Sequence, residues 1–139
     1  MSERVELHAN LSAKQGELNA CVSAVASLEA KIQRIKELIA DFEALKADLK
    51  SLKKDLDKDA KATHTYWVGK RLEKYQNILG DDLSDSALKS YIDNVDDNLD
   101  ELNNALMRLE NELYNMEGLI GNIKSAINWI STKIENLIN

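Results

Sequence analysis

Histidine, cysteine and clustered aspartate are the side chains of this sequence best suited to catalysis or metal binding. The two histidines, His8 and His64, fall near opposite ends of one predicted helix, too far apart to share a metal ion or to pair a base with a nucleophile. The single cysteine, Cys21, has no histidine at helical spacing and lies between Ala20 and Val22. We therefore predict that the chain is not an enzyme, and that Cys21 is a small buried apolar residue.

An acidic stretch spans residues 81–101, where Lys89 is the only basic residue. A calcium loop would need oxygen ligands at alternating positions and a glycine at the sixth, and the run 93–98 has no glycine. The sequence also lacks a glycine-rich phosphate loop. We predict no metal and no cofactor. The stretch is either a solvated acidic face or a surface for basic residues such as Lys70, Arg71 and Lys74 of another subunit.

The composition limits the classes of partner. The 139 residues carry a formal net charge of −6, which argues against binding to nucleic acid, because phosphates require a basic face. The first residues have no apolar core of the signal-peptide type, and no apolar run is long enough to span a membrane. We expect a cytoplasmic protein. Export by a route without a cleavable signal stays open.

The elements that must carry these residues are two long helices, since the chain has no proline and its apolar residues recur every three or four positions. In the second half the apolar repeat is uninterrupted: Leu88, Ile92, Val95, Leu99, Leu102, Leu106, Leu109, Leu113, Met116, Ile120, Ile123, Ile127, Ile130, Ile134 and Leu137. The pattern predicts a single all-α domain over 1–139, an elongated antiparallel helical hairpin with coiled-coil-like packing. We expect helices over about 4–61 and 84–137, and between them a short helix over about 65–79 that ends at Gly80. A kink at Gly80 would fit the sequence almost as well.

Apolar residues also lie beside this repeat, and a two-helix seam cannot cover them. Such a seam needs about two apolar residues in seven, whereas a helix in a larger bundle shows three or more. We therefore predict a helical partner, which is a second copy of the chain or a different protein. The partner-binding and tip residues that we predict are Trp67, Gly69, Leu72, Tyr75, Tyr91, Met107, Tyr114, Leu119 and Trp129.

Two features of the last helix have alternative interpretations. Gly118 and Gly121 mark either a close helix contact or a local weak point, and we favour the contact. The segment 119–138 is amphipathic and lightly charged, so it could lie on a membrane surface. Only Lys124 and Lys133 are basic there, and packing against a partner helix explains the pattern better.

The sequence Trp67-Val68-Gly69 falls at the predicted turn between the long helices of a small, acidic, proline-free chain. In this respect the chain resembles the WXG-type helical-hairpin superfamily associated with type VII (ESX) secretion in Gram-positive bacteria. Its length, its extra short helix and its heptads are more similar to the YwqH-like group, small α-helical proteins associated with LXG-domain toxins. Only Trp67 and Gly69 carry the motif itself.

This resemblance implies a non-catalytic adaptor or targeting chaperone. It would bind the helical N-terminal domain of an LXG-type toxin, together with a second small helical partner in some assemblies, and could leave the cell with its cargo. The superfamily's export signal, a tyrosine followed four residues later by an acid, is absent after all four tyrosines. The resemblance therefore implies that a partner supplies the signal. The alternatives are a homodimeric four-helix scaffold and a membrane-active helical protein.

Overall fold

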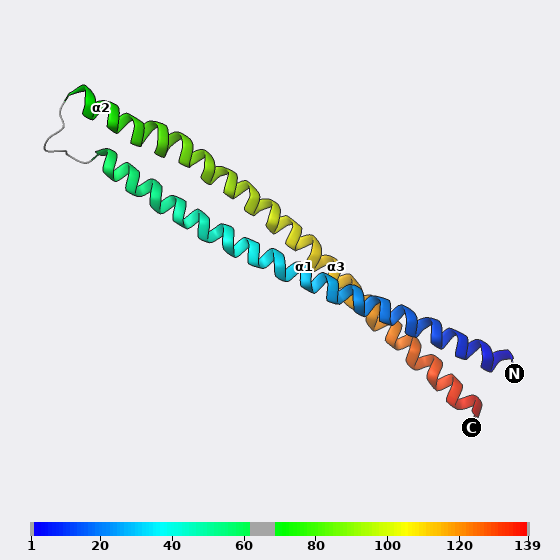
Figure 1. The fold of residues 1–139 in the computed structure, drawn as a ribbon. Coiled ribbons are helices and arrows are strands. Elements are labelled where there is room, and N and C mark those ends of the chain that lie inside the picture. Colours follow the sequence, from blue (N-terminus) through cyan, green and yellow to red (C-terminus); the bar gives the residue numbers. More distant parts are fainter. Residues whose placement is uncertain (1, 62–68, 139) are drawn as a thin grey trace. The chain divides into compact units, whose positions relative to one another are not determined.

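The computed structural model describes residues 2–61 and 69–138, and all of these except the turn residue Gly69 are helical. Helix α1 spans Ser2–Lys61, and helix α2 spans Lys70–Asn77. Helix α2 continues without a break into the π-helix η1 (Ile78–Leu88), which continues into α3 (Lys89–Ile138) (Figure 1). The described residues form no β-strand, so the predicted all-α helical hairpin is confirmed.

The chain divides into two compact units, which we name by their place in the sequence. The terminal unit consists of Met1–Arg34 and Leu106–Asn139, and the central unit is the continuous segment Ile35–Ala105. In each unit, part of α1 lies antiparallel to part of the chain that returns after it (Figure 1). The prediction that the whole chain is one folding domain stays a prediction.

The core of the terminal unit is aliphatic and narrow. Helix α1 contributes Cys21, Leu28 and Ile32, and α3 contributes Ile123, Ile130 and Ile134. These residues recur at spacings of four or seven, so one face of each helix is covered. Cys21 is a free thiol within this core, as its sequence neighbours predicted.

The core of the central unit combines apolar packing with one buried hydroxyl. Ala60 of α1 and three residues of α3, Ile92, Val95 and Leu99, are buried. Ser84 of η1 is fully covered. A hydroxyl group is costly to bury unless it forms a hydrogen bond, so Ser84 requires polar partners within this unit.

The predicted break at Gly80 is wrong, because the backbone stays helical from α2 through η1 into α3. Gly80 does not have a positive φ angle, which a helix-ending glycine usually adopts. Gly80 instead lies beside α1 within the helical run, where a Cβ atom would make an ordinary van der Waals contact of 3.5 Å with the Cβ atom of Ala60. The helix expected to begin near residue 84 is therefore the continuation of one that begins at Lys70.

The turn residue that the structure describes is Gly69. Its φ of 77° and ψ of −146° lie in a region open almost only to glycine. The amide of Glu73 donates a hydrogen bond of 3.1 Å to the Gly69 carbonyl oxygen, and this bond opens the helix. Trp67 and His64 lie outside the described residues.

Candidate partner-binding surfaces

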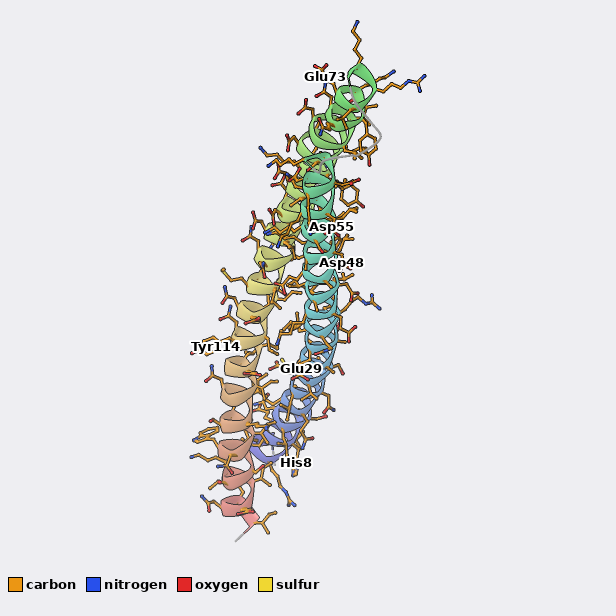
Figure 2. The ribbon with its side chains drawn as sticks, turned by 90° about the vertical axis from the view of Figure 1, so that its left-hand side faces the viewer. His8, Glu29, Asp48, Asp55, Glu73 and Tyr114 are labelled. Carbon is orange, nitrogen blue, oxygen red and sulfur yellow. The ribbon has the colours of Figure 1, made fainter. Side chains whose placement is uncertain are left out.

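The terminal unit exposes large apolar side chains on α3. Tyr114 is 77% exposed, Met107 62%, Trp129 60% and Leu119 46%. In Figure 2 the Tyr114 side chain points away from the helix pair, on the side of α3 opposite to α1. The two helices of this unit therefore leave apolar side chains uncovered. The sequence pattern predicted that a two-helix seam could not cover them.

The row of α3 residues that carries Tyr114 has no charged member between Tyr114 and Thr132, and Glu117 and Lys124 lie along one edge of this row. Its exposed members recur every three or four residues and are small or neutral: Tyr114, Gly118, Gly121, Ser125, Asn128 and Thr132. The solvated face of a helix usually carries charged residues. A neutral, partly aromatic face is better suited to contact with another protein surface than to solvent.

The two glycines of this face leave open space. A Cβ atom at Gly118 or Gly121 would meet nothing within 4 Å among the described residues. The predicted close helix contact at this pair is therefore absent within the described chain. A shallow groove lies over Gly118 instead, and Tyr114, Leu119 and Asn122 are among the residues that line it.

Helix α1 of the terminal unit has a similar neutral face, which the sequence analysis did not identify as a surface. Its exposed members are Ser12, Gly16, Ala20, Ser23, Ser27 and Ala30. Val22 lies next to this face and is 51% exposed. Both helices of this unit therefore present small, uncharged side chains outward.

The central unit contains a wide apolar groove of about 490 Å³ between α1 and the returning chain. Helix α1 lines it with Leu45, Leu49, Leu52 and Leu56, and the opposite wall is formed by Leu83, Ala87, Leu88 and Tyr91. Leu52, Leu83 and Tyr91 are each more than 40% exposed. Of these three residues, Tyr91 was predicted as a partner-binding residue, and Leu52 and Leu83 were not.

One side of the central unit is closed by ion pairs between α1 and the returning chain. Lys46 pairs with Asp96 of α3. Lys53 lies 3.1 Å from the Asp57 carboxylate and 3.4 Å from that of Asp85 in η1. By helical spacing, Lys46 and Lys53 lie on the flank of α1 away from Leu52. The apolar groove is therefore on the opposite flank.

Ser84 joins this polar side from η1. Its hydroxyl group donates a hydrogen bond to the Asp57 carboxylate and lies 3.4 Å from the carbonyl oxygen of Lys53. The bond from Ser84, followed by the one from Lys53, lowers the pKa of Asp57. The bond to Asp57 raises the pKa of Lys53, and the bond to Asp96 raises that of Lys46.

These pKa directions indicate a structural cluster. Asp57 stays ionised and Lys53 stays protonated at neutral pH, so neither is poised to exchange a proton. Ser84 is fully buried, so a substrate could not reach its hydroxyl group. The cluster satisfies polar groups that the close approach of η1 and α1 would otherwise leave without partners.

At the start of α2, the predicted tip residues Leu72 and Tyr75 are half-buried. The Tyr75 hydroxyl group donates a hydrogen bond of 2.6 Å to Asp59 of α1, and this bond raises the pKa of Tyr75. Tyr75 also lines a small open pocket with Arg71, Lys74 and Ile78. Of the predicted set, Leu72, Tyr75 and Tyr91 therefore belong to the central unit, and the residues from Met107 onward belong to the terminal unit.

Within the described ranges, the chain shows no group of three or more histidine, cysteine, aspartate or glutamate side chains that could hold a metal ion. His8 is exposed on α1. None of the described helices combines the length and the apolar character needed to cross a membrane.

The central groove was missed because its far wall does not follow the 3.5-residue repeat. Leu83, Ala87 and Tyr91 of this wall recur at intervals of four residues. A π-helix has more residues per turn than an α-helix, so this longer interval suits a π-helical wall. The recurrence of apolar residues every four positions is the sequence feature from which this groove could have been predicted.

Comparison with known proteins adds no family assignment, since no protein family, curated protein or solved structure matches this sequence.

Proposed function

We propose that the chain is a non-catalytic helical adaptor that chaperones the helical N-terminal domain of an LXG-type toxin for type VII secretion. The observation that carries this proposal is the exposure of Tyr114 and Trp129 along one face of α3, with Met107 and Leu119 also exposed on the same helix. Burying an aromatic or aliphatic side chain of this size is worth about 1.5–3 kcal/mol. A partner helix that covered this face would gain that stabilisation at several positions.

The type of surface supports a partner that is itself helical. The exposed neutral face on each helix of the terminal unit contains glycine, alanine or serine at spacings of three and four. Small residues at this spacing allow a neighbouring helix to approach closely, and large residues such as Trp129 fill the remaining space. Lys133, whose Nζ atom lies 5.3 Å from the centre of the Trp129 ring, holds that ring at the edge of the face.

Co-expression with a candidate cargo tests the proposal. The wild-type chain should copurify with a tagged LXG N-terminal domain. The double variant Tyr114→Gln/Trp129→Gln should not copurify with it. The matched control combines Val5→Gln with Ile138→Gln, which alters two comparably exposed apolar residues near the chain ends. Equal recovery of all three chains would contradict the proposed surface.

Self-assembly is the competing outcome. Light scattering of the purified wild-type chain alone distinguishes the two functions. A stable dimer that Tyr114→Gln/Trp129→Gln converts to monomer would identify this face as a homodimer interface and would support the scaffold alternative. A monomer that forms a complex only with the toxin domain supports the adaptor.

A further inference from the structure

The central groove is a second helix-binding surface, distinct from the exposed face of α3 in the terminal unit. It is lined on both walls by aliphatic side chains and by Tyr91, and it opens on the flank opposite to the ion pairs of Lys46 and Lys53. Leu45, Leu49, Leu52 and Leu56 recur every three or four residues, which is the spacing that receives the apolar stripe of another helix.

The rim of this groove is acidic on one side only. Asp48 and Asp55 lie four residues before and three residues after Leu52, so both are its neighbours on the surface of α1. They follow one another along this helix in Figure 2, and both are exposed. Among the described residues, neither carboxylate forms an ion pair, in contrast to Asp57 and Asp96 on the other flank.

The opposite rim is neutral. The residues that neighbour Tyr91 on its own helical surface are Ala87 and Asn94, and those next to Leu83 include Ser86 and Ala87. A helix seated in the groove would therefore meet carboxylates along one edge only. The complementary helix carries an apolar stripe with lysine or arginine along one edge of that stripe.

A second copy of this chain offers no basic edge along its exposed apolar face. Tyr114 and Leu119 have Asn115, Glu117 and Asn122 beside them. The basic residues of this part of α3 are Lys124 and Lys133, which lie over different sides of the helix because they are nine positions apart, and of these two only Lys133, among the described residues, contacts an exposed apolar side chain, that of Trp129.

We propose that the central groove binds one amphipathic helix of a protein partner, with basic residues of that helix paired to Asp48 and Asp55. This inference rests on the proposed adaptor function and assigns to its cargo a helix of this chemistry. The leucines and Tyr91 supply the affinity, and the two carboxylates select the orientation and the charge of the bound helix.

The test uses the full chain and two synthetic helical peptides of about 21 residues, long enough to form a stable helix once bound. Both peptides carry leucines at spacings of three and four; one has lysines along an edge of the stripe and the other has glutamates there. The lysine peptide should bind the wild-type chain more tightly than the glutamate peptide, and added salt should reduce that difference. The Asp48→Lys/Asp55→Lys variant should bind the lysine peptide about tenfold or more weakly than the wild type does, since two ion pairs are replaced by repulsion between like charges.

The control is Asp93→Lys/Asp97→Lys, which makes the same change of charge on exposed positions of α3 that do not line the groove. Equal affinity for the two peptides, or an equal loss in the control variant, would overturn the proposal. The proposal would also be overturned if the wild-type chain formed a dimer and Leu52→Asp abolished that dimer, because the groove would then bind a second copy of the chain.

Binding of the LXG toxin domain separates this inference from the proposed function. If the domain binds the wild type and the Asp48→Lys/Asp55→Lys variant equally well, the adaptor function stands and the groove assignment fails. If the toxin domain does not bind but the lysine peptide does, the assignment of the groove stands and the proposal that the toxin is the cargo fails.

Discussion

Asp57, Lys53 and Ser84 form the most constrained polar contacts between the described residues. Each occupies a position that a sequence pattern would place on a solvated helical face, yet Ser84 is fully buried against α1. From the sequence, Ser84 was expected only as part of the acidic stretch at the start of the last helix. Ser84 instead directs its hydroxyl group to the Asp57 side chain.

The first prediction concerns Asp57. Its pKa is lowered in the folded chain by the Ser84 and Lys53 hydrogen bonds, whereas in the unfolded chain it should titrate near its usual value of about 3.9. The ionised carboxylate therefore stabilises the fold above that pH, and this contribution is lost as the pH falls through the lower, folded value. The stability difference between the wild type and Asp57→Asn should shrink below about pH 4.

Chemical denaturation at a series of pH values measures this difference. The matched control is Asp55→Asn, because Asp55 is exposed and its carboxylate forms no ion pair with another described residue. Its stability should follow the wild-type pH profile. A difference between the wild type and Asp57→Asn that does not vary with pH would show that the two hydrogen bonds do not favour the ionised form.

Gly69 carries the second residue-scale prediction. Because its φ is +77°, Gly69→Ala should lower the free energy of unfolding by about 1–3 kcal/mol. Gly16→Ala is the control within α1: its Cβ atom would meet nothing within 4 Å, so it should raise the stability by up to about 1 kcal/mol. Urea denaturation followed by circular dichroism measures both variants. A Gly69→Ala variant as stable as the wild type would contradict the observed backbone.

At the scale of the elements, the apolar repeat predicted the two long helices well. Helix α1 ends at Lys61 as expected, and α3 reaches Ile138. The π-helix was not predicted, because Gly80 and the aspartates that follow it also fit a helix end and a new start. Tertiary contacts decide between these local possibilities, and here the contact between Gly80 and Ala60 and the hydrogen bonds of Ser84 favour continuation.

The neutral face of α3 provides a prediction for the same scale. Since Gly118 and Gly121 leave open space, replacing both with alanine should raise the stability of the free chain by about 1 kcal/mol per site. The same variant should bind a helical partner less tightly if the partner backbone approaches these glycines. Thermal unfolding of the free chain checks the first part. A lower melting temperature would indicate that the glycines are packed against the chain itself.

At the scale of the whole molecule, charge is distributed unevenly along the chain. Between Leu113 and Ile134 the only charged residues are Glu117, Lys124 and Lys133, whereas most of the acidic residues behind the net charge of −6 belong to the central unit. The sequence alone predicted that apolar width exceeds what two helices can cover. It identified Tyr91, Met107, Tyr114, Leu119 and Trp129, which are exposed, but it missed Val22, Leu52 and Leu83, because their exposure depends on how the helices of each unit are rotated about their axes.

The central claim is that Tyr114 and Trp129 are uncovered until a helical partner binds. Hydroxyl-radical footprinting with mass spectrometry tests it on the full chain, alone at low concentration and in complex with the LXG toxin domain. We predict strong labelling of both residues in the free chain and clear protection in the complex, with the buried Ile123 unlabelled in both states. Protection in the free chain at every concentration, or labelling that the complex leaves unchanged, would contradict the claim.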